Sequence, residues 1–174
     1  MDRSDPYHAG MRDLQDQRDT RRLADRLAEV TLRQAFTAED REFISRCRML
    51  FLASADSQGH PDCSYKGGAP GFVQVSDERT LEVPDYDGNG MYLSMGNVLQ
   101  TAQVGMLFLD FENQQRMRVN GEARIEKEDS LMAEYPEAQF IVRVRAREVF
   151  PNCPRYIHKM QLIERSRFVP KTSC

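Results

Sequence analysis

The sequence has no tryptophan, and its few cysteines and histidines are scattered along the chain. The cysteines stand at positions 47, 63, 153 and 174, and the histidines at positions 8, 60 and 158. This spacing contains neither a CxxC redox motif nor a zinc ribbon, and no HExxH pattern. The sequence therefore predicts no metal site, and it predicts free thiols in a reducing compartment.

Long apolar runs and an excess of basic residues are also missing. No segment approaches the roughly 18 apolar residues that a membrane span needs, and the first residues lack the apolar core of a signal peptide. The net charge of -3 and the pI near 5.7 argue against a nucleic-acid partner. A length of 174 residues suits one domain. We expect a cytoplasmic protein that binds neither membrane nor nucleic acid.

The N-terminal part of the chain has helical character. Residues 11–36 contain no proline or glycine, and Leu23, Leu27 and Val30 recur at helical steps, which predicts one amphipathic helix. Thr37 with Asp40 three residues later resembles a capping box and predicts a second helix over 38–47. We therefore divide the chain into an N-terminal, mostly helical extension at 1–36 and a main domain at 37–174.

From residue 49 onward the pattern is that of short β-strands. Strands are predicted at 49–53, 61–65, 72–75, 81–83, 104–111, 116–125 and 140–150, with a connector holding a helical turn at 128–138. Segment 91–103 favours a helix, and a hairpin turned at 87–90 is the alternative. About seven strands with few crossovers predict a mainly β fold, a barrel or sandwich with flanking helices.

Two motifs carry polar groups suited to a phosphorylated ligand. In DCSYKGGAPGFV, at 62–73, a strand ends in Lys66, which offers positive charge, and two glycines that allow close backbone approach. In GNGMYLSMGN, at 88–97, Asn89, Ser94 and Asn97 offer donors near the start of the predicted helix. Each residue also has a plain structural interpretation: a solvated turn lysine, a turn asparagine, and a helix N-cap serine.

In this order and spacing, the segments between 42 and 154 resemble the FMN-binding split-barrel family, the pyridoxamine 5′-phosphate oxidase-like proteins. The resemblance implies a split β-barrel that forms a homodimer with FMN at the subunit interface. It further implies that the polar strand segment at 116–121 reaches the flavin ring. The implied cofactor site comprises Asp62, Cys63, Ser64, Lys66, Gly67, Asn89, Ser94, Asn97, Arg116 and Arg118.

The sequence departs from the family pattern in two places. Met91, Leu93 and Gly96 stand where family members commonly carry an arginine or lysine, which leaves Lys66 with more of the phosphate charge. True pyridoxamine 5′-phosphate oxidases end in a segment rich in tryptophan and arginine, and this chain has no tryptophan. Oxidation of vitamin B6 is therefore not expected.

The resulting hypothesis is an FMN-dependent oxidoreductase that acts as a homodimer on a small molecule, with the chemistry supplied by the flavin. Tyr65, Tyr92 and Tyr156 are candidates for proton transfer, and nothing in the sequence selects one of them. One alternative is a non-catalytic flavin-binding or sensing protein. Another is a split barrel that binds a deazaflavin or haem, for which His60 is a candidate axial ligand.

Overall fold

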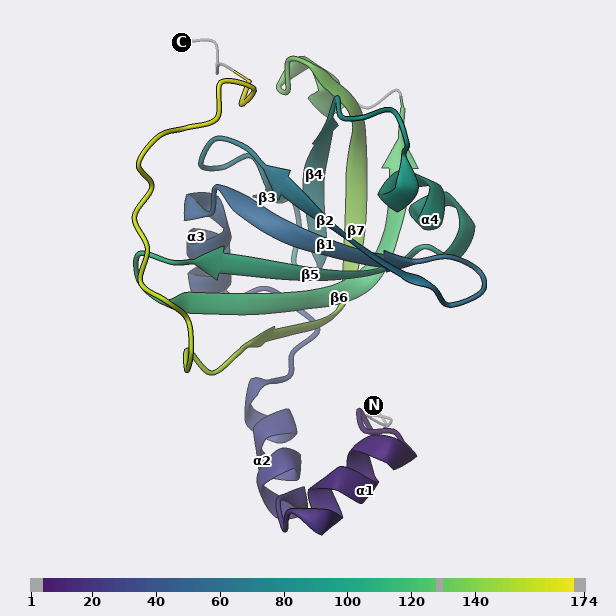
Figure 1. Cartoon of the computed structure of the whole chain (residues 1–174), viewed down its shortest axis with the longest axis vertical. Helices are drawn as coiled ribbons and strands as arrows, with labels where there is room; N and C mark the ends of the chain where they lie inside the picture. The colour runs from purple at the N-terminus through teal and green to yellow at the C-terminus, as the bar shows by residue number, and fades with distance from the viewer. Residues whose placement is uncertain (1–4, 128–129, 171–174) are drawn as a thin grey trace. The chain divides into compact units, whose positions relative to one another are not determined.

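The structure, a computed structural model, describes residues 5–127 and 130–170. The chain divides into two units, Met1–Leu32 and Arg33–Cys174. The first contains helices α1 (Ala9–Gln17) and α2 (Arg21–Thr31), and the second contains the sheet, α3 and α4 (Figure 1). None of the described helices has both the length and the hydropathy that crossing a bilayer requires.

The first unit corrects the prediction of one continuous helix over 11–36. The helix breaks between α1 and α2 at Asp19, which has a φ of 53° and so lies in the left-handed region that aspartate tolerates. Polar contacts then hold the two helices together. The Tyr7 hydroxyl donates to the Ala24 carbonyl at 2.8 Å, and the Arg12 guanidinium lies 2.6 Å from Asp25. The absence of proline and glycine from residues 11–36 therefore did not ensure one continuous helix.

The second unit begins with α3 (Ala38–Arg46), at the site where the capping box was predicted. Thr37 Oγ accepts from the Asp40 backbone N–H, and the Asp40 carboxylate accepts from the Thr37 backbone N–H. Arg33 Nη2 donates to the same carboxylate at 2.9 Å. The helix start is confirmed, and the helix ends one residue before the predicted boundary.

A seven-stranded antiparallel sheet forms the main part of the described portion of this unit. Its strands are β1 (Met49–Ala55), β2 (Pro61–Gly67), β3 (Gln74–Val75), β4 (Thr80–Tyr86), β5 (Gln103–Asp110), β6 (Gln115–Glu126) and β7 (Ala138–Pro151). The strand order is β2-β1-β5-β6-β7-β4-β3. Segment 91–103 is helical, as α4 (Leu93–Thr101), so the alternative hairpin is wrong. The predicted helical turn of the connector is η1 (Ser130–Ala133), while residues 128–129 lie outside the described part.

The sheet folds over on itself, which is visible where β1, β2, β5 and β6 cross in front of β4 and β7 (Figure 1). The register of β6 against β7 shifts between Asn120 and Gly121. A Cβ at Gly121 would lie 2.2 Å from the Arg145 carbonyl oxygen, so only glycine permits this close approach. Strands β2 and β4, which do not neighbour each other in the sheet, then meet through an ion pair between Lys66 and Asp85. The result is the predicted split barrel.

The interior of the barrel is apolar. The largest fully buried side chains include Leu50, Leu81, Met106, Phe108 and Val119, which come from four of the strands. Helix α4 contacts β1, β2 and β6, and it contributes Met95 and Val98 to the core. Because α4 packs beside β2, the polar residues at its first turns are brought to the strand that carries the predicted site.

Candidate functional site

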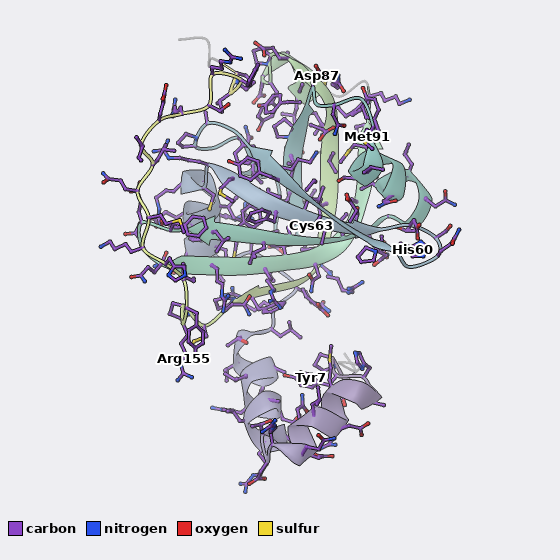
Figure 2. The ribbon with its side chains drawn as sticks, viewed as in Figure 1. Tyr7, His60, Cys63, Asp87, Met91 and Arg155 are labelled. Atoms are coloured by element: carbon purple, nitrogen blue, oxygen red, sulfur yellow. The ribbon has the colours of Figure 1, made fainter. Side chains whose placement is uncertain are left out.

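Alternate residues of β2 face the interior of the barrel. Asp62, Ser64 and Lys66 pair in register with Ser54, Leu52 and Leu50 of β1, and these three partners are buried. Since successive side chains of a strand point to opposite faces, Cys63 and Tyr65 lie on the outer face. Cys63 is exposed, and it is labelled on β2 in Figure 2. Half of the predicted β2 segment is thus directed inward.

The first inward group is a hydrogen-bonded cluster between β2 and α4. Ser94 Oγ lies 2.9 Å from Asp62 Oδ2 and 2.9 Å from Ser64 Oγ. An ionised carboxylate only accepts, so Ser94 donates to Asp62 and accepts from Ser64. One turn further along α4, Asn97 Nδ2 donates to the buried Ser54 hydroxyl at 3.1 Å. The structure brings these predicted site residues together, and their polar groups already satisfy one another.

The second inward group is the Lys66–Asp85 ion pair. The Lys66 ammonium lies 2.6 Å from Asp85 Oδ1, and the side chains are 22% and 6% exposed. Asp85 therefore neutralises the positive charge of Lys66, which the sequence analysis had assigned to binding a phosphate. The Asp85 carboxylate belongs to β4 and stands nineteen positions after Lys66 in the sequence.

The remaining predicted residues lie elsewhere. Asn89 Oδ1 accepts from the Met91 backbone N–H, which is the geometry of a turn. Arg116 and Arg118 lie on β6, which two strands separate from β2 in the sheet order β2-β1-β5-β6. Arg118 is exposed, and Arg116 has a buried Nε without a hydrogen-bond partner among the described atoms. The structure does not join these three residues to the β2–α4 cluster, and their binding roles stay predictions.

A cleft of about 350 Å³ lies at the ends of β2 and β4. Lys66 and Gly67 line it from β2, residues 84–88 line it from β4 and its following loop, and residues between 162 and 169 line it from the C-terminal segment. We call this space the β2–β4 cleft. Its volume falls within the range of about 300–1,000 Å³ that is typical of small-molecule sites.

Two arginines that the sequence analysis did not select line the β2–β4 cleft. Arg48 precedes β1, and Arg165 belongs to the C-terminal segment. Both are exposed, and neither guanidinium has a hydrogen-bond or ion-pair partner in the described part of the chain. By contrast, Asp87 of the cleft accepts from Gln139 at 3.0 Å. No local sequence pattern marks Arg48 or Arg165, because the fold alone brings them to Lys66.

The haem alternative finds little support in the geometry of its candidate axial ligand His60. The His60 ring nitrogen Nδ1 lies 2.9 Å from Asp56 Oδ2 in the exposed β1–β2 turn, and His60 does not line the cleft. Among residues 5–127 and 130–170, no group of three or more histidine, cysteine, aspartate or glutamate side chains is arranged to hold a metal ion.

Comparisons with known proteins agree with this fold. A candidate pyridoxamine 5′-phosphate oxidase from Lactobacillus delbrueckii is similar, with 21% identity, a TM-score of 0.55, and coverage of 68% of this chain and 95% of that one. HupZ from Group A Streptococcus shows 16% identity and a TM-score of 0.53, over 67% of this chain and 93% of its own. No curated protein matches the sequence.

The family model described as pyridoxamine 5′-phosphate oxidase matches residues 36–166, which include α3, all seven strands and most of the C-terminal segment. The match thus extends beyond the 42–154 stretch on which the resemblance was recognised, and it includes both arginines of the β2–β4 cleft. The chain belongs to the pyridoxamine 5′-phosphate oxidase family, whose fold is the flavin-binding split barrel.

Proposed function

We propose that this protein binds FMN in the β2–β4 cleft and acts as a homodimeric oxidoreductase on a small molecule. The observation that carries the proposal is the pair of unpartnered guanidinium groups, Arg48 and Arg165, beside Lys66 in a cleft of about 350 Å³. Arginine is well suited to phosphate, because its planar fork donates two parallel hydrogen bonds. The cleft lies near the lower end of the size range for ligand sites, which favours FMN over the larger FAD.

The β2–α4 cluster fits a phosphate poorly. Its one carboxylate, Asp62, would repel the anion, and the Ser94 hydroxyl is already bonded to that carboxylate. Helix α4 has no arginine or lysine in its first turn. The β2–β4 cleft supplies what the cluster lacks, since it combines three basic residues with two acidic ones.

In this proposal the residues of the cleft have distinct roles. Arg48 and Arg165 hold the phosphate, Asp87 accepts from hydroxyl groups of the ribityl chain, and Tyr65 and Phe168 cover the ring. The flavin, when bound, supplies hydride or electron transfer. The protein's contribution is to orient the cofactor and to exclude water with the C-terminal segment.

Exposed apolar side chains support dimerisation. Tyr156, Ile163 and Phe168 of the C-terminal region are 95%, 100% and 76% exposed, and Tyr65 on the outer face of β2 is 61% exposed. Monomers rarely expose many large apolar groups close together, because water solvates them poorly. A second copy of the chain would bury this surface, and light scattering after size-exclusion chromatography measures the oligomeric state directly.

The cofactor proposal is tested by the absorption spectrum of the purified full-length protein and by the mass of any molecule that heat releases. We expect flavin bands and the mass of FMN, or uptake of added FMN by colourless protein. Arg48→Ala and Arg165→Ala should each weaken FMN binding about tenfold or more, since each removes charge-assisted bonds. Arg155→Ala is the matched control, because Arg155 is exposed and does not line the cleft.

Two results would contradict the assignment of this cleft. Protein that remains colourless after incubation with FMN contradicts flavin binding itself. Equal loss of affinity in Arg155→Ala and Arg48→Ala shows that the effect comes from net charge rather than from the cleft.

A non-catalytic flavin-binding protein is the second candidate function. The observation that favours it is the state of the acidic groups of the cleft: Asp85 is bound to Lys66, and Asp87 is bound to Gln139. Neither histidine nor cysteine is found among the described lining residues. Turnover of NADH or NADPH with an added acceptor by the FMN-loaded protein distinguishes the two functions. Flavin that stays oxidised under these conditions indicates the binding role.

A further inference from the structure

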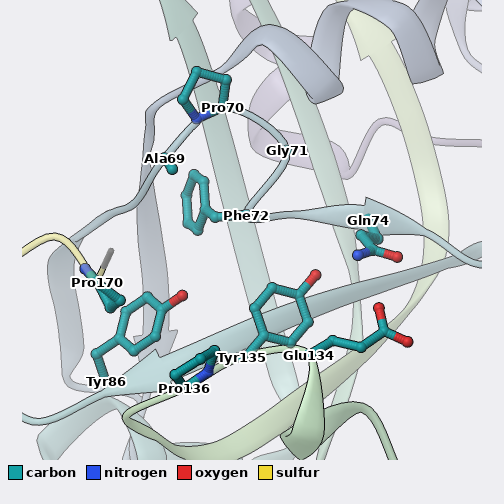
Figure 3. A pocket seen from close by; sticks show the side chains of 10 residues that line it. All are labelled: Ala69, Pro70, Gly71, Phe72, Gln74, Tyr86, Glu134, Tyr135, Pro136 and Pro170. Carbon is teal, nitrogen blue, oxygen red and sulfur yellow. The ribbon is translucent and has the colours of Figure 1, made fainter. Parts of the chain in front are cut away.

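A smaller cavity of about 150 Å³ lies between the β2–β3 loop, the end of β4 and the connector that follows β6 (Figure 3). Its walls include the rings of Phe72, Tyr86 and Tyr135, together with prolines from the β2–β3 loop, the connector and the C-terminal segment. We call this cavity the tyrosine pocket. Tyr86 also lines the β2–β4 cleft, so the two spaces share one wall.

The tyrosine pocket is negatively charged. Glu134 is its only formally charged residue, and no lysine, arginine or histidine occurs among the described residues that line it. Gln74 adds an amide oxygen, and Figure 3 shows both Gln74 and the Glu134 carboxylate close to Tyr135. Cavities of this kind favour cations, because aromatic faces and carboxylates both attract positive charge.

The Tyr135 hydroxyl is the second, independent observation. Tyr135 is 7% exposed, and its buried oxygen makes no well-formed hydrogen bond in the described structure, since the neighbouring Gln74 side chain interacts with it without meeting hydrogen-bond geometry. A buried hydroxyl without a partner is costly, so a ligand or a water molecule is expected to bond to it. Burial is the main reason why the pKa of Tyr135 is raised to about 12; the interaction with the Gln74 side chain opposes this shift, and the negative charges of Tyr86 and Glu134 add smaller upward contributions. The hydroxyl therefore stays protonated and neutral at physiological pH.

We propose that the tyrosine pocket binds a small organic ammonium ion through the faces of Phe72, Tyr86 and Tyr135, with Glu134 as the counter-charge. A cavity of about 150 Å³ accepts a molecule of roughly the size of benzene, about six non-hydrogen atoms. An ammonium with N–H groups gains one further contact, because the Tyr135 oxygen accepts a hydrogen bond. The site adjoins the proposed flavin site at Tyr86, and the argument for it does not depend on a bound flavin.

The test is a titration of the full-length protein with tetramethylammonium chloride, followed by NMR of the backbone amides and aromatic rings. Sodium chloride at the same ionic strength controls for salt, and tert-butanol controls for size and shape without charge. We expect saturable shifts at the tyrosine pocket, and binding of tert-butanol that is weaker by about tenfold or more.

Three variants separate the contributions. Glu134→Gln should weaken tetramethylammonium binding several-fold, and Glu134 is exposed, so the fold is retained. Tyr135→Phe should leave tetramethylammonium binding nearly unchanged but weaken propylammonium, whose N–H groups need the hydroxyl. Tyr156→Phe is the matched control, because this side chain is 95% exposed and lies outside the pocket.

The proposal is overturned by any of three results. These are an absence of tetramethylammonium shifts beyond those of sodium chloride, equal binding of tert-butanol, and equally tight binding of the cation by Glu134→Gln and the unaltered protein. Circular dichroism of each variant confirms that the comparison is made on folded protein. Because no flavin is added, failure here leaves the FMN proposal intact, and the reverse also holds.

Discussion

Replacing Lys66 should destabilise the barrel more than replacing its partner Asp85. The two charges lie 2.6 Å apart, and Asp85 is the more buried side chain, with 6% exposure against 22%. Lys66→Met leaves the Asp85 carboxylate buried without a counter-charge, which costs about 3–5 kcal/mol of unfolding free energy. Asp85→Asn keeps an oxygen that accepts from Lys66, and the lysine can extend its head group into the cleft. The expected cost is then about 1–2 kcal/mol.

Urea unfolding followed by circular dichroism measures these costs, and the double variant provides the control. Since the harm in Lys66→Met comes from the unpaired carboxylate, Lys66→Met combined with Asp85→Asn should be more stable than Lys66→Met alone. A cost below about 1 kcal/mol for Lys66→Met, or simple additivity in the double variant, would refute the idea that this pair joins the two edges of the split barrel.

The same pair gives a prediction for the cofactor. Asp85→Asn removes the negative charge that neutralises the Lys66 ammonium, so FMN should bind severalfold more tightly although the protein is less stable. Fluorescence quenching of added FMN measures the affinity. Unchanged or weaker binding in Asp85→Asn would show that Lys66 does not face the phosphate.

Three further predictions concern glycines, thiols and pH. Gly121→Ala should lower the free energy of unfolding by more than about 3 kcal/mol, because its Cβ would meet a backbone oxygen at 2.2 Å. Gly96→Ala has open space around it and should stabilise α4 by about 0.5–1 kcal/mol. Thermal denaturation measures both effects. Burial raises the pKa of Cys47 to about 12. A thiol reagent at pH 8 should therefore modify the exposed Cys63 promptly in the folded protein, and Cys47 only after unfolding. Peptide mapping identifies which cysteine has reacted. Burial also raises the pKa of Tyr135 to about 12 from an unperturbed value of 10. The neutral tyrosine therefore contributes fully to the free energy of unfolding below pH 10, and this contribution should fall by about 2 kcal/mol as the pH rises to 12. Denaturation of Tyr135→Phe and of the unaltered protein at several pH values would measure the difference.

Features with a local cause could be predicted from the sequence. The capping box at Thr37 requires only residues three apart, and the alternation in β6 and β7 requires only a period of two, so both were found. The helix break at Asp19 was missed, because the two helices it separates are held by contacts between residues far apart in the sequence, such as Arg12 with Asp25. No spacing rule encodes a contact of that kind.

The site residues divide in the same way. The inward alternation of Asp62, Ser64 and Lys66 follows from strand geometry, and the polar donors near the start of α4 were recognised in the sequence. The partners of these residues could not be predicted, because Asp85 reaches Lys66 only after the sheet has folded over on itself. Arg165 is less predictable still, since its position depends on a C-terminal segment without regular secondary structure.

The charges on β2 and β4 hold the two edges of the barrel together. The Asp62 carboxylate accepts a hydrogen bond from Ser94, which joins α4 to β2. The Asp85 carboxylate forms an ion pair with Lys66, which joins β4 to β2. Groups committed to closing the barrel can bind a ligand only by giving up that contact, which costs stability. Side chains that make no contact of this kind can bind a ligand without loss of stability. In the β2–β4 cleft these side chains are Arg48 and Arg165. Ligand binding in this chain should therefore depend more on these two arginines than on the motif residues that first suggested a site.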